Sequence, residues 1–123
     1  MKNIVVRNTS QTPIYQQLHD QISSQIINGD LKADDNLPSM RTIAKELRVS
    51  IITIKKTWEL LERNGYIYTI KGKGSYVKNN TKKDLNKKRL ETVRELLKES
   101  LLLCKDYEIT KEELISIVDE FYK

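Results

Sequence analysis

The segment from residue 37 to residue 77 constrains the fold of this 123-residue chain more than any other part of it. Ser39 and Ser50 each stand directly before an apolar run, in the position where serine commonly caps a helix. Gly65 ends the second run, because glycine tolerates the left-handed backbone that follows a helix. Residues 66–77 alternate around a basic tip with two glycines, which is typical of a β-hairpin. A helix, a turn, a helix and a basic hairpin in this order predict a winged helix-turn-helix.

Another helix is expected before this segment. Pro13 suits its first position, Thr12 suits its cap, and Gly29 suits its end. Its apolar stripe consists of Ile14, Leu18, Ile22 and Ile26. The second helix is expected to bury Met40, Ile43, Ala44 and Leu47, and the third helix Ile54, Trp58 and Leu61.

The last third of the chain has a different pattern. After a polar linker at residues 79–83, an apolar stripe predicts a long helix over about residues 83–104. Thr110 and Glu113 have the spacing of a capping box, so a final helix is expected after them. The predicted fold class is mainly α with a small β-hairpin. It comprises a winged helix-turn-helix DNA-binding domain over residues 1–78 and a two-helix dimerisation tail over residues 79–123.

The long helix of the tail is too apolar to stand alone in water, and the short final helix offers it little cover. A second copy of the chain is the simplest source of cover, and a two-fold dimer presents two recognition helices to a palindromic site. The alternative is a helical hairpin packed on the winged helix of the same chain. The residues predicted for the dimer contact are Val93, Leu96, Leu97, Leu101, Ile117 and Phe121.

The excess of positive charge lies with the winged helix. The chain holds 22 Lys and Arg against 17 Asp and Glu, for a net charge of +5. Residues 1–80 hold 12 of the basic and 7 of the acidic residues, whereas residues 81–123 hold 10 of each. A concentrated basic surface favours a polyanion such as double-stranded DNA as partner, although a merely solubilising surface has the same composition.

Other classes of function find little support in the sequence. The single cysteine, Cys104, excludes an internal disulfide and suits a buried position in a reducing cytosol. No segment has the apolar length of a signal peptide or a membrane span, so a soluble, cytoplasmic protein without a membrane partner is expected. His19 has no metal-ligating neighbours and is expected at the surface or facing a second copy. The segment 72–75 lacks the spacing of a phosphate-binding loop. An enzymatic function is therefore not expected, and neither is a bound metal or a cofactor. No residue indicates a small-molecule effector.

The recognition helix is predicted at residues 50–64. The N-terminal half of such a helix enters the major groove, where Lys55 would bond guanine or a phosphate. Ser50 and Thr53 would hold phosphates through their hydroxyls, or simply cap the helix.

The wing is predicted at residues 66–77, and its basic tip would enter the minor groove or contact phosphates. Arg41, one turn into the second helix, would reach DNA or form a surface ion pair with Glu46. The DNA-binding residues predicted in this way are Ser39, Arg41, Ser50, Ile51, Thr53, Lys55, Lys56, Lys71, Gly72, Lys73 and Gly74.

Several runs of residues, in this order, resemble the GntR family of bacterial transcription regulators. They are Pro13-Ile14-Tyr15-Gln16-Gln17-Leu18, Gly29-Asp30-Leu31, Leu37-Pro38-Ser39-Met40-Arg41-Thr42-Ile43-Ala44-Lys45-Glu46-Leu47, Val49-Ser50, Thr53-Ile54-Lys55, Leu61-Glu62-Arg63-Asn64-Gly65-Tyr66-Ile67 and Gly72-Lys73-Gly74-Ser75-Tyr76-Val77. The resemblance covers residues 10–78, and the short tail is similar to that of the YtrA-type subfamily.

The resemblance implies a homodimeric repressor at an operator, often beside genes for membrane transporters. It also implies DNA contacts at Arg41, Ile51, Lys55 and the segment 71–74. An arginine is common in the family where this chain has Ile51, which cannot donate to guanine but can touch a thymine methyl. The favoured hypothesis is a sequence-specific transcription regulator. The alternative is a winged-helix protein-interaction module, for which the outward pair Ile51 and Ile52 is the best support.

Overall fold

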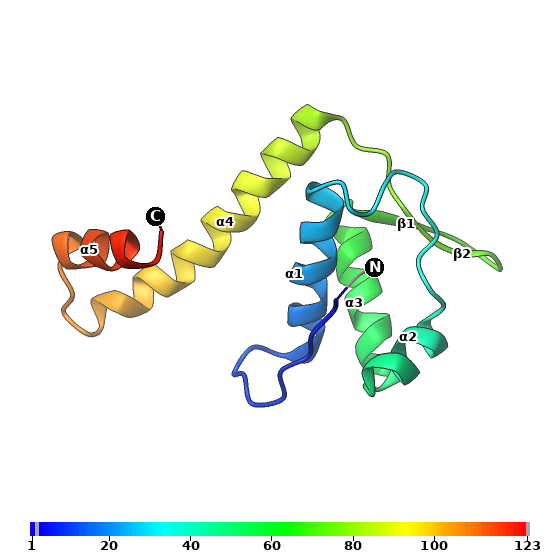
Figure 1. The fold of residues 1–123 in the computed structure, drawn as a ribbon, viewed down its shortest axis with the longest axis horizontal. Helices are drawn as coiled ribbons and strands as arrows, with labels where there is room; N and C mark the ends of the chain where they lie inside the picture. The colour runs from blue at the N-terminus through cyan, green and yellow to red at the C-terminus, as the bar shows by residue number, and fades with distance from the viewer. Residues whose placement is uncertain (2, 123) are drawn as a thin grey trace. The chain divides into compact units, whose positions relative to one another are not determined.

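The computed structural model describes all residues except 2 and 123. The chain divides into two compact units, Met1–Leu85 and Asn86–Lys123. Within the described residues the chain forms five α-helices and one two-stranded antiparallel hairpin (Figure 1). These elements confirm the predicted fold class, a mainly α protein with a small hairpin.

Three helices pack together in the first unit. α1 (Ile14–Ile27) and α2 (Met40–Leu47) both contact α3 (Ile51–Arg63). Each helix has apolar residues at helical spacing, so one face is buried and the other is exposed. The predicted faces are confirmed by the buried residues Leu18, Ile22, Ile26, Ile43, Ala44, Ile54, Trp58 and Leu61. Ile14, Met40 and Leu47 are partly buried against the same cluster.

The start of α1 differs from the prediction. Pro13 holds the cap position, because its carbonyl accepts the first helical hydrogen bonds, and no side chain caps the helix. The prediction of Thr12 as the cap was therefore wrong. The Thr12 carbonyl instead accepts a 2.8 Å hydrogen bond from Gln17 Nε2, so Thr12 belongs to the N-terminal arm. Gly29 follows the end of the helix as predicted, with a φ of 85°.

The predicted caps of the next two helices are confirmed. Ser39 Oγ accepts a hydrogen bond from Thr42 N–H at 3.1 Å, and Ser50 Oγ accepts one from Thr53 N–H at 3.0 Å. Between the helices Arg48 takes a left-handed conformation, with a φ of 57°. This residue makes the tight turn that lets α3 begin soon after α2.

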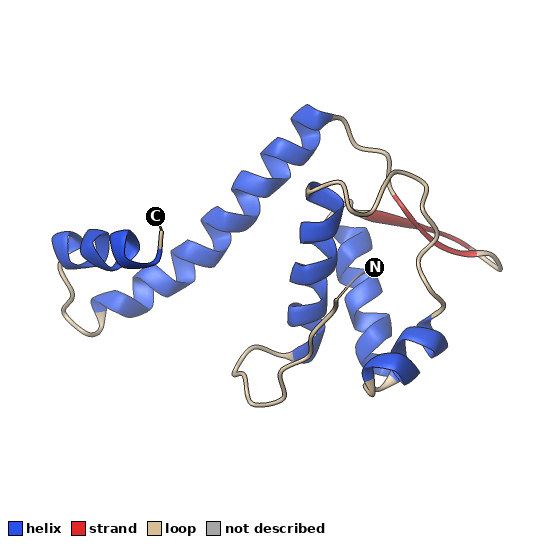
Figure 2. Ribbon diagram, in the orientation of Figure 1, coloured by secondary structure: helices blue, strands red, loops and turns tan. Residues whose placement is uncertain are grey.

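The hairpin follows α3 directly. β1 (Ile67–Ile70) and β2 (Gly74–Val77) form the hairpin (Figure 2). They pair antiparallel, with Ile67 opposite Val77. Both of these residues are buried, whereas the opposite end of the hairpin is exposed. The hairpin is therefore fixed to the core at its base and projects its tip.

The chain before α2 is bonded to the outer side of β2. Asp34 N–H donates to the carbonyl of Val77, and Leu37 N–H donates to the carbonyl of Ser75, both at 2.8 Å. The start of α2 is thus tied to the hairpin by backbone bonds.

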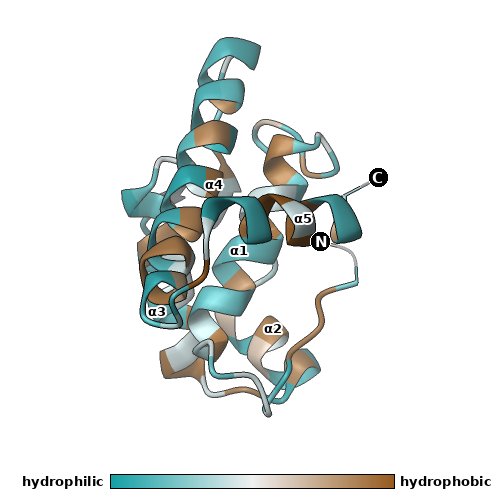
Figure 3. Ribbon diagram, turned by 90° about the vertical axis from the view of Figure 1, so that its left-hand side faces the viewer, coloured by the Kyte–Doolittle hydropathy of each residue, from teal (hydrophilic) through white to brown (hydrophobic). Residues whose placement is uncertain are grey.

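The tail consists of α4 (Lys82–Lys105) and α5 (Lys111–Phe121), in agreement with the two predicted helices. α5 begins with the predicted capping box, in which Glu113 N–H donates to Thr110 Oγ1 and Thr110 N–H to Glu113 Oε1, both at 3.1 Å. The structure describes every residue of these two helices, and none of them is buried. Apolar residues recur along α4 and gather on α5 (Figure 3). None of the described helices combines the length and the apolar character needed to cross a bilayer.

Two side chains lie elsewhere than expected. His19 is only 5% exposed, and its ring lies edge-on to that of Tyr66 at 5.9 Å, so the prediction of a surface or dimer-facing histidine was wrong. Asp20 and Asn64 supply polar partners, which make burial of the imidazole tolerable. Cys104 is partly exposed rather than buried, because the tail has no core of its own.

Candidate nucleic-acid interface

The hydroxyls in the first turn of α3 bond to the helix itself. Ser50 caps the helix, and its Oγ lies 2.8 Å from Oγ1 of the half-buried Thr53. The Thr53 carbonyl accepts a further bond from the buried Thr57 hydroxyl at 2.9 Å. The capping role that the sequence left open for Ser50 is confirmed, while phosphate contact through these hydroxyls stays a prediction. The first amides of the helix still lack intrahelical acceptors and suit an anion.

Two isoleucines are the apolar side chains that this turn presents to solvent. Ile51 is 48% exposed and Ile52 is 80% exposed. At about 100° per residue, Ile52 lies nearly opposite the buried row of Ile54, Trp58 and Leu61. The outward placement predicted for both isoleucines is confirmed.

The two lysines of α3 lie on different sides of the helix. Lys56 Nζ lies 4.0 Å from the centre of the Tyr15 ring on α1, at the distance of a cation–π contact. Lys55 is exposed and follows Ile51 by one turn, so it shares the side of that residue. Sequence reasoning missed this contact of Tyr15 with Lys56.

α2 carries an exposed cation close to its capped start. Arg41 is exposed and lies two residues after Ser39, which is also exposed. In the described part of the chain there is no ion pair between Arg41 and Glu46. The Arg41 guanidinium therefore does not form the surface ion pair with Glu46 that the sequence offered as an alternative.

The wing tip is a short exposed turn between β1 and β2. Its residues are Lys71, Gly72, Lys73 and Gly74, all exposed. Lys73 N–H donates to the carbonyl of Ile70 at 2.9 Å and closes the turn. Gly72 has a φ of 81° and Gly74 a φ of 129°, which confirms the predicted need for glycine. The turn therefore places two ammonium groups at the end of the hairpin.

Two tyrosines and an aspartate hold the base of the wing. The rings of Tyr68 and Tyr76 stack with centres 5.5 Å apart. The Tyr68 hydroxyl donates to Asp34 Oδ1 at 2.8 Å, and this bond raises the pKa of Tyr68 above its usual value. Sequence reasoning missed this anchor.

The predicted cations come from three elements of one unit. In Figure 1 α2 and the hairpin lie to one side of α3, and α1 lies to the other. The backbone bond between Leu37 and Ser75 holds the entry to α2 against β2. Arg41, Lys55 and the wing tip are thus carried by elements that pack on one another, whereas Lys56 turns toward α1.

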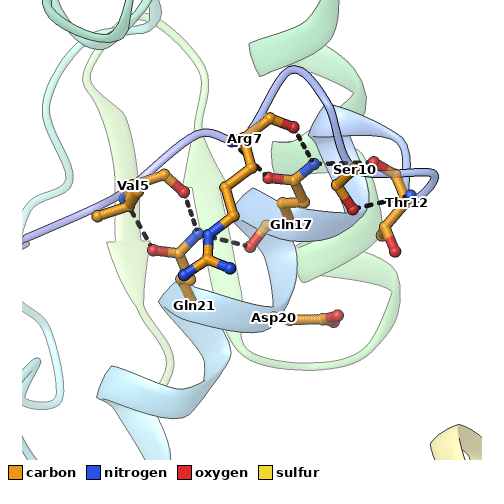
Figure 4. Close-up of a pocket in the computed structure, with 7 residues that line it drawn as sticks. All are labelled: Val5, Arg7, Ser10, Thr12, Gln17, Asp20 and Gln21. Atoms are coloured by element: carbon orange, nitrogen blue, oxygen red, sulfur yellow. Dashed lines mark hydrogen bonds between the residues drawn. The ribbon is translucent and has the colours of Figure 1, made fainter.

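An open hollow lies between the N-terminal arm and α1 (Figure 4). Gln21 exchanges two hydrogen bonds with the backbone of Val5, at 2.9 and 2.7 Å, and Gln17 does the same with Arg7, at 2.9 and 3.0 Å. The side-chain amides of Gln17 and Gln21 thus bond the backbone of the arm as a neighbouring strand would, and they fix the arm to α1. Among the described residues, no group of three or more His, Cys, Asp and Glu side chains could hold a metal ion.

The tail exposes a row of large apolar side chains. The residues predicted for a dimer contact are all exposed: Val93, Leu96, Leu97, Leu101, Ile117 and Phe121. Seven further residues of the tail share this exposure: Leu90, Leu102, Leu103, Tyr107, Ile115, Val118 and Tyr122. An apolar surface of this extent, with no buried residue in either helix, is typical of a segment that is covered by a partner.

Comparison with known proteins agrees with this geometry. Residues 14–77 match the family model for bacterial regulatory proteins, gntR family. The chain is 34% identical over 93 residues to the HTH-type transcriptional repressor YtrA of Bacillus subtilis (strain 168), a match that covers 76% of this chain and 72% of that protein. It is similar to the crystal structure of a transcriptional antiterminator from Listeria monocytogenes EGD-e, with a TM-score of 0.73, 33% identity and coverage of 97% and 89%. It also resembles AraR(DBD) in complex with operator ORX1, with a TM-score of 0.55, 28% identity and coverage of 59% and 92%.

Proposed function

The chain belongs to the gntR family of bacterial regulatory proteins, and on this premise we propose that it is a homodimeric repressor that binds a palindromic operator. The GntR family predicted from the sequence is confirmed, together with the predicted YtrA-type subfamily. The chain is a winged-helix transcription regulator and not an enzyme.

The junction of α2, α3 and the hairpin is the observation that carries the proposal. α3 enters the major groove with its first turns, as the recognition helix of a helix-turn-helix does. Arg41 at the start of α2 and Lys73 at the wing tip then contact the phosphates on either side, and Lys55 contacts a base or a phosphate. The capped starts of α2 and α3, at Ser39 and Ser50, supply amides for further phosphates.

The tail supports the dimeric part of the proposal. We assign residues 1–78 to DNA binding and residues 79–123 to the contact between two copies. Association with a second copy is favourable because it removes the exposed apolar side chains of α4 and α5 from water. A two-fold contact also sets two copies of α3 on one operator, so the half-sites of that operator mirror the symmetry of the protein.

The setting of this function is inferred from the family resemblance. We propose that the regulator acts in the cytoplasm and controls genes for membrane transporters. No small-molecule effector is proposed.

The test begins with genomic DNA fragments selected by the purified chain. The affinity for the best fragment is then measured by fluorescence anisotropy at rising salt. Lys55→Ala and Lys73→Ala are each expected to weaken binding, and each variant that removes a phosphate contact lowers the salt slope by about one. Lys105→Ala in the tail is the matched control and is expected to keep the wild-type slope.

Two results would count against the proposal. Unchanged affinity and salt slope in both Lys55→Ala and Lys73→Ala would mean that DNA binds another surface. Half-sites without palindromic order would contradict the two-fold arrangement.

One observation favours a second function, a winged helix that binds a protein. Ile52 is 80% exposed at the start of α3, and apolar side chains suit protein surfaces better than phosphates. If the purified chain retards no genomic DNA at low salt, this alternative replaces operator binding.

A further inference from the structure

We propose that this chain selects its operator by the methyl groups of thymine, which Ile51 and Ile52 contact from the first turn of α3. The proposal rests on the operator binding proposed above. It adds the chemical feature of the bases that the recognition helix reads.

The two isoleucines are placed and shaped for such a contact. Ile52 points away from the core of the first unit, and Ile51 lies about 100° from it around the helix axis. An isoleucine in a helix has one strongly preferred χ1 rotamer, so contact with a ligand costs it little side-chain entropy. Removal of its exposed methyl groups from water is favourable. The first turn of α3 therefore presents a preformed apolar surface where a recognition helix meets base edges.

The polar groups of the same turn are bonded to one another. Ser50 Oγ accepts the Thr53 amide proton, and the Ser50 and Thr53 hydroxyls bond each other at 2.8 Å. The side chains that project from the turn, Ile51 and Ile52, have neither a donor for guanine nor an acceptor for cytosine. The thymine C5-methyl is the apolar group that base pairs present in the major groove. Methyl contact is therefore the form of readout that these residues can perform.

The surroundings of the pair favour DNA over a protein as its partner. Lys55 follows Ile51 by one turn, Arg41 stands at the start of α2, and the amides at the start of α3 add partial positive charge. An apolar contact inside a cationic frame matches a base edge between two phosphate chains. An apolar protein surface would leave those charges without complementary groups.

The experiment replaces thymine by deoxyuridine, one position at a time, in the operator that the purified chain selects. Deoxyuridine lacks only the C5-methyl and keeps every hydrogen-bonding edge, so the change isolates the methyl contact. We expect about a fourfold loss of affinity at two positions in each half-site, one for each isoleucine, which is the effect of one buried methyl. Every other thymine is expected to be replaceable without loss.

Variants of the protein assign each sensitive thymine to a side chain. Ile51→Ala and Ile52→Ala are each expected to bind thymine and deoxyuridine equally at one sensitive position, while they keep the discrimination at the other. Val5→Ala changes an exposed branched residue of the N-terminal arm and is the matched control, which keeps the discrimination at both. Thermal melts of the four proteins check that the fold is unchanged.

The outcomes separate this inference from the proposed function. An operator that binds selectively but tolerates deoxyuridine at every position overturns methyl readout and leaves operator binding intact. Discrimination that survives at both sensitive positions in each isoleucine variant also overturns it. Failure to select any DNA overturns operator binding and this inference together, and it favours a protein as the partner of the isoleucine pair.

Discussion

The imidazole Nε2 of His19 on α1 lies 2.9 Å from the side-chain amide Nδ2 of Asn64, the residue that ends α3. The other ring nitrogen, Nδ1, lies 3.0 Å from Asp20 Oδ1. Because an amide nitrogen only donates, Nε2 accepts this bond, and the Nδ1 proton is donated to the carboxylate. A buried polar side chain thus links the first helix to the end of the recognition helix.

This link predicts that Asn64→Ala is destabilising. The variant leaves Nε2 of the buried His19 without this donor, and a buried unsatisfied acceptor costs about 1 to 3 kcal/mol of unfolding free energy. Urea denaturation measures the loss. Asn28→Ala is the matched control, because Asn28 ends α1 and its side-chain amide donates only a long, exposed hydrogen bond, to Ser24 Oγ at 3.4 Å. The control is expected to change stability by less than about 0.5 kcal/mol. Equal losses of unfolding free energy in Asn64→Ala and Asn28→Ala would mean that the His19–Asn64 bond adds no stability of its own.

The features that the sequence predicted correctly are those with local signals. Ser39, Ser50 and Thr110 cap helices through amides three residues later, so each signal lies within one turn of the chain. The apolar faces of α1, α2 and α3 follow from spacing alone. The glycines of the wing follow from the turn that a hairpin needs.

The features that were missed depend on partners distant in sequence. His19 is separated from Asn64 by most of the winged helix, and no spacing rule connects them. The bond between Tyr68 and Asp34 and the contact between Lys56 and Tyr15 are of the same kind. Composition shows that such side chains exist, but only the packing of the helices brings them together.

The bond between Tyr68 and Asp34 predicts a pH dependence at the base of the wing. It raises the pKa of Tyr68, so the folded state favours the protonated hydroxyl. Its contribution to stability is complete below the ordinary pKa of tyrosine and is lost as the pH rises through the raised value. Asp34→Asn removes the carboxylate charge and is expected to lower the pKa of Tyr68 toward its usual value.

An NMR titration of the tyrosine ring carbons measures this pKa. Asp35→Asn is the matched control, because the Asp35 carboxylate accepts from Lys32 N–H and takes no part in the raised pKa of Tyr68. A Tyr68 titration that is the same in wild type and Asp34→Asn would contradict the proposed anchor.

The two glycines of the wing tip are predicted to differ in their tolerance of asparagine. Gly72 has a φ of 81° and open space where the Cβ of another residue would lie, and asparagine tolerates the left-handed region well. Gly74 has a φ of 129°, outside the region that other residues adopt readily, and its Cβ would lie 3.5 Å from Asn36 Oδ1. Gly74→Asn is therefore expected to lose about 1 to 3 kcal/mol of unfolding free energy, and Gly72→Asn distinctly less. Urea denaturation compares them, and a larger loss for Gly72→Asn would contradict the ranking.

The proposed dimer predicts the effect of a charge on α4. Leu97→Lys places an ammonium group within the exposed apolar row and is expected to weaken self-association by at least about tenfold, because an unpaired buried charge is costly. Sedimentation equilibrium measures the change. Glu95→Lys introduces the same side chain on nearly the opposite side of the helix and is expected to leave self-association unchanged. Equal weakening by both variants would point to net charge rather than to the apolar contact.

The capping box of α5 predicts a graded response at acid pH. The Thr110 backbone N–H, and to a smaller extent its hydroxyl, hold the pKa of Glu113 below its usual value. The resulting stability is complete above the ordinary pKa of glutamate and is lost as the pH falls through the lowered value. Thr110→Ala removes only the hydroxyl, whereas Thr110→Pro also removes the N–H, at a φ of −79° that proline tolerates. An NMR titration should therefore show the pKa of Glu113 rising in the alanine variant and rising further in the proline variant. Glu113→Gln has no ionisable group at this position and should lose this part of the acid dependence of helix content. If the same acid dependence persisted in Glu113→Gln, it would arise from other carboxylates.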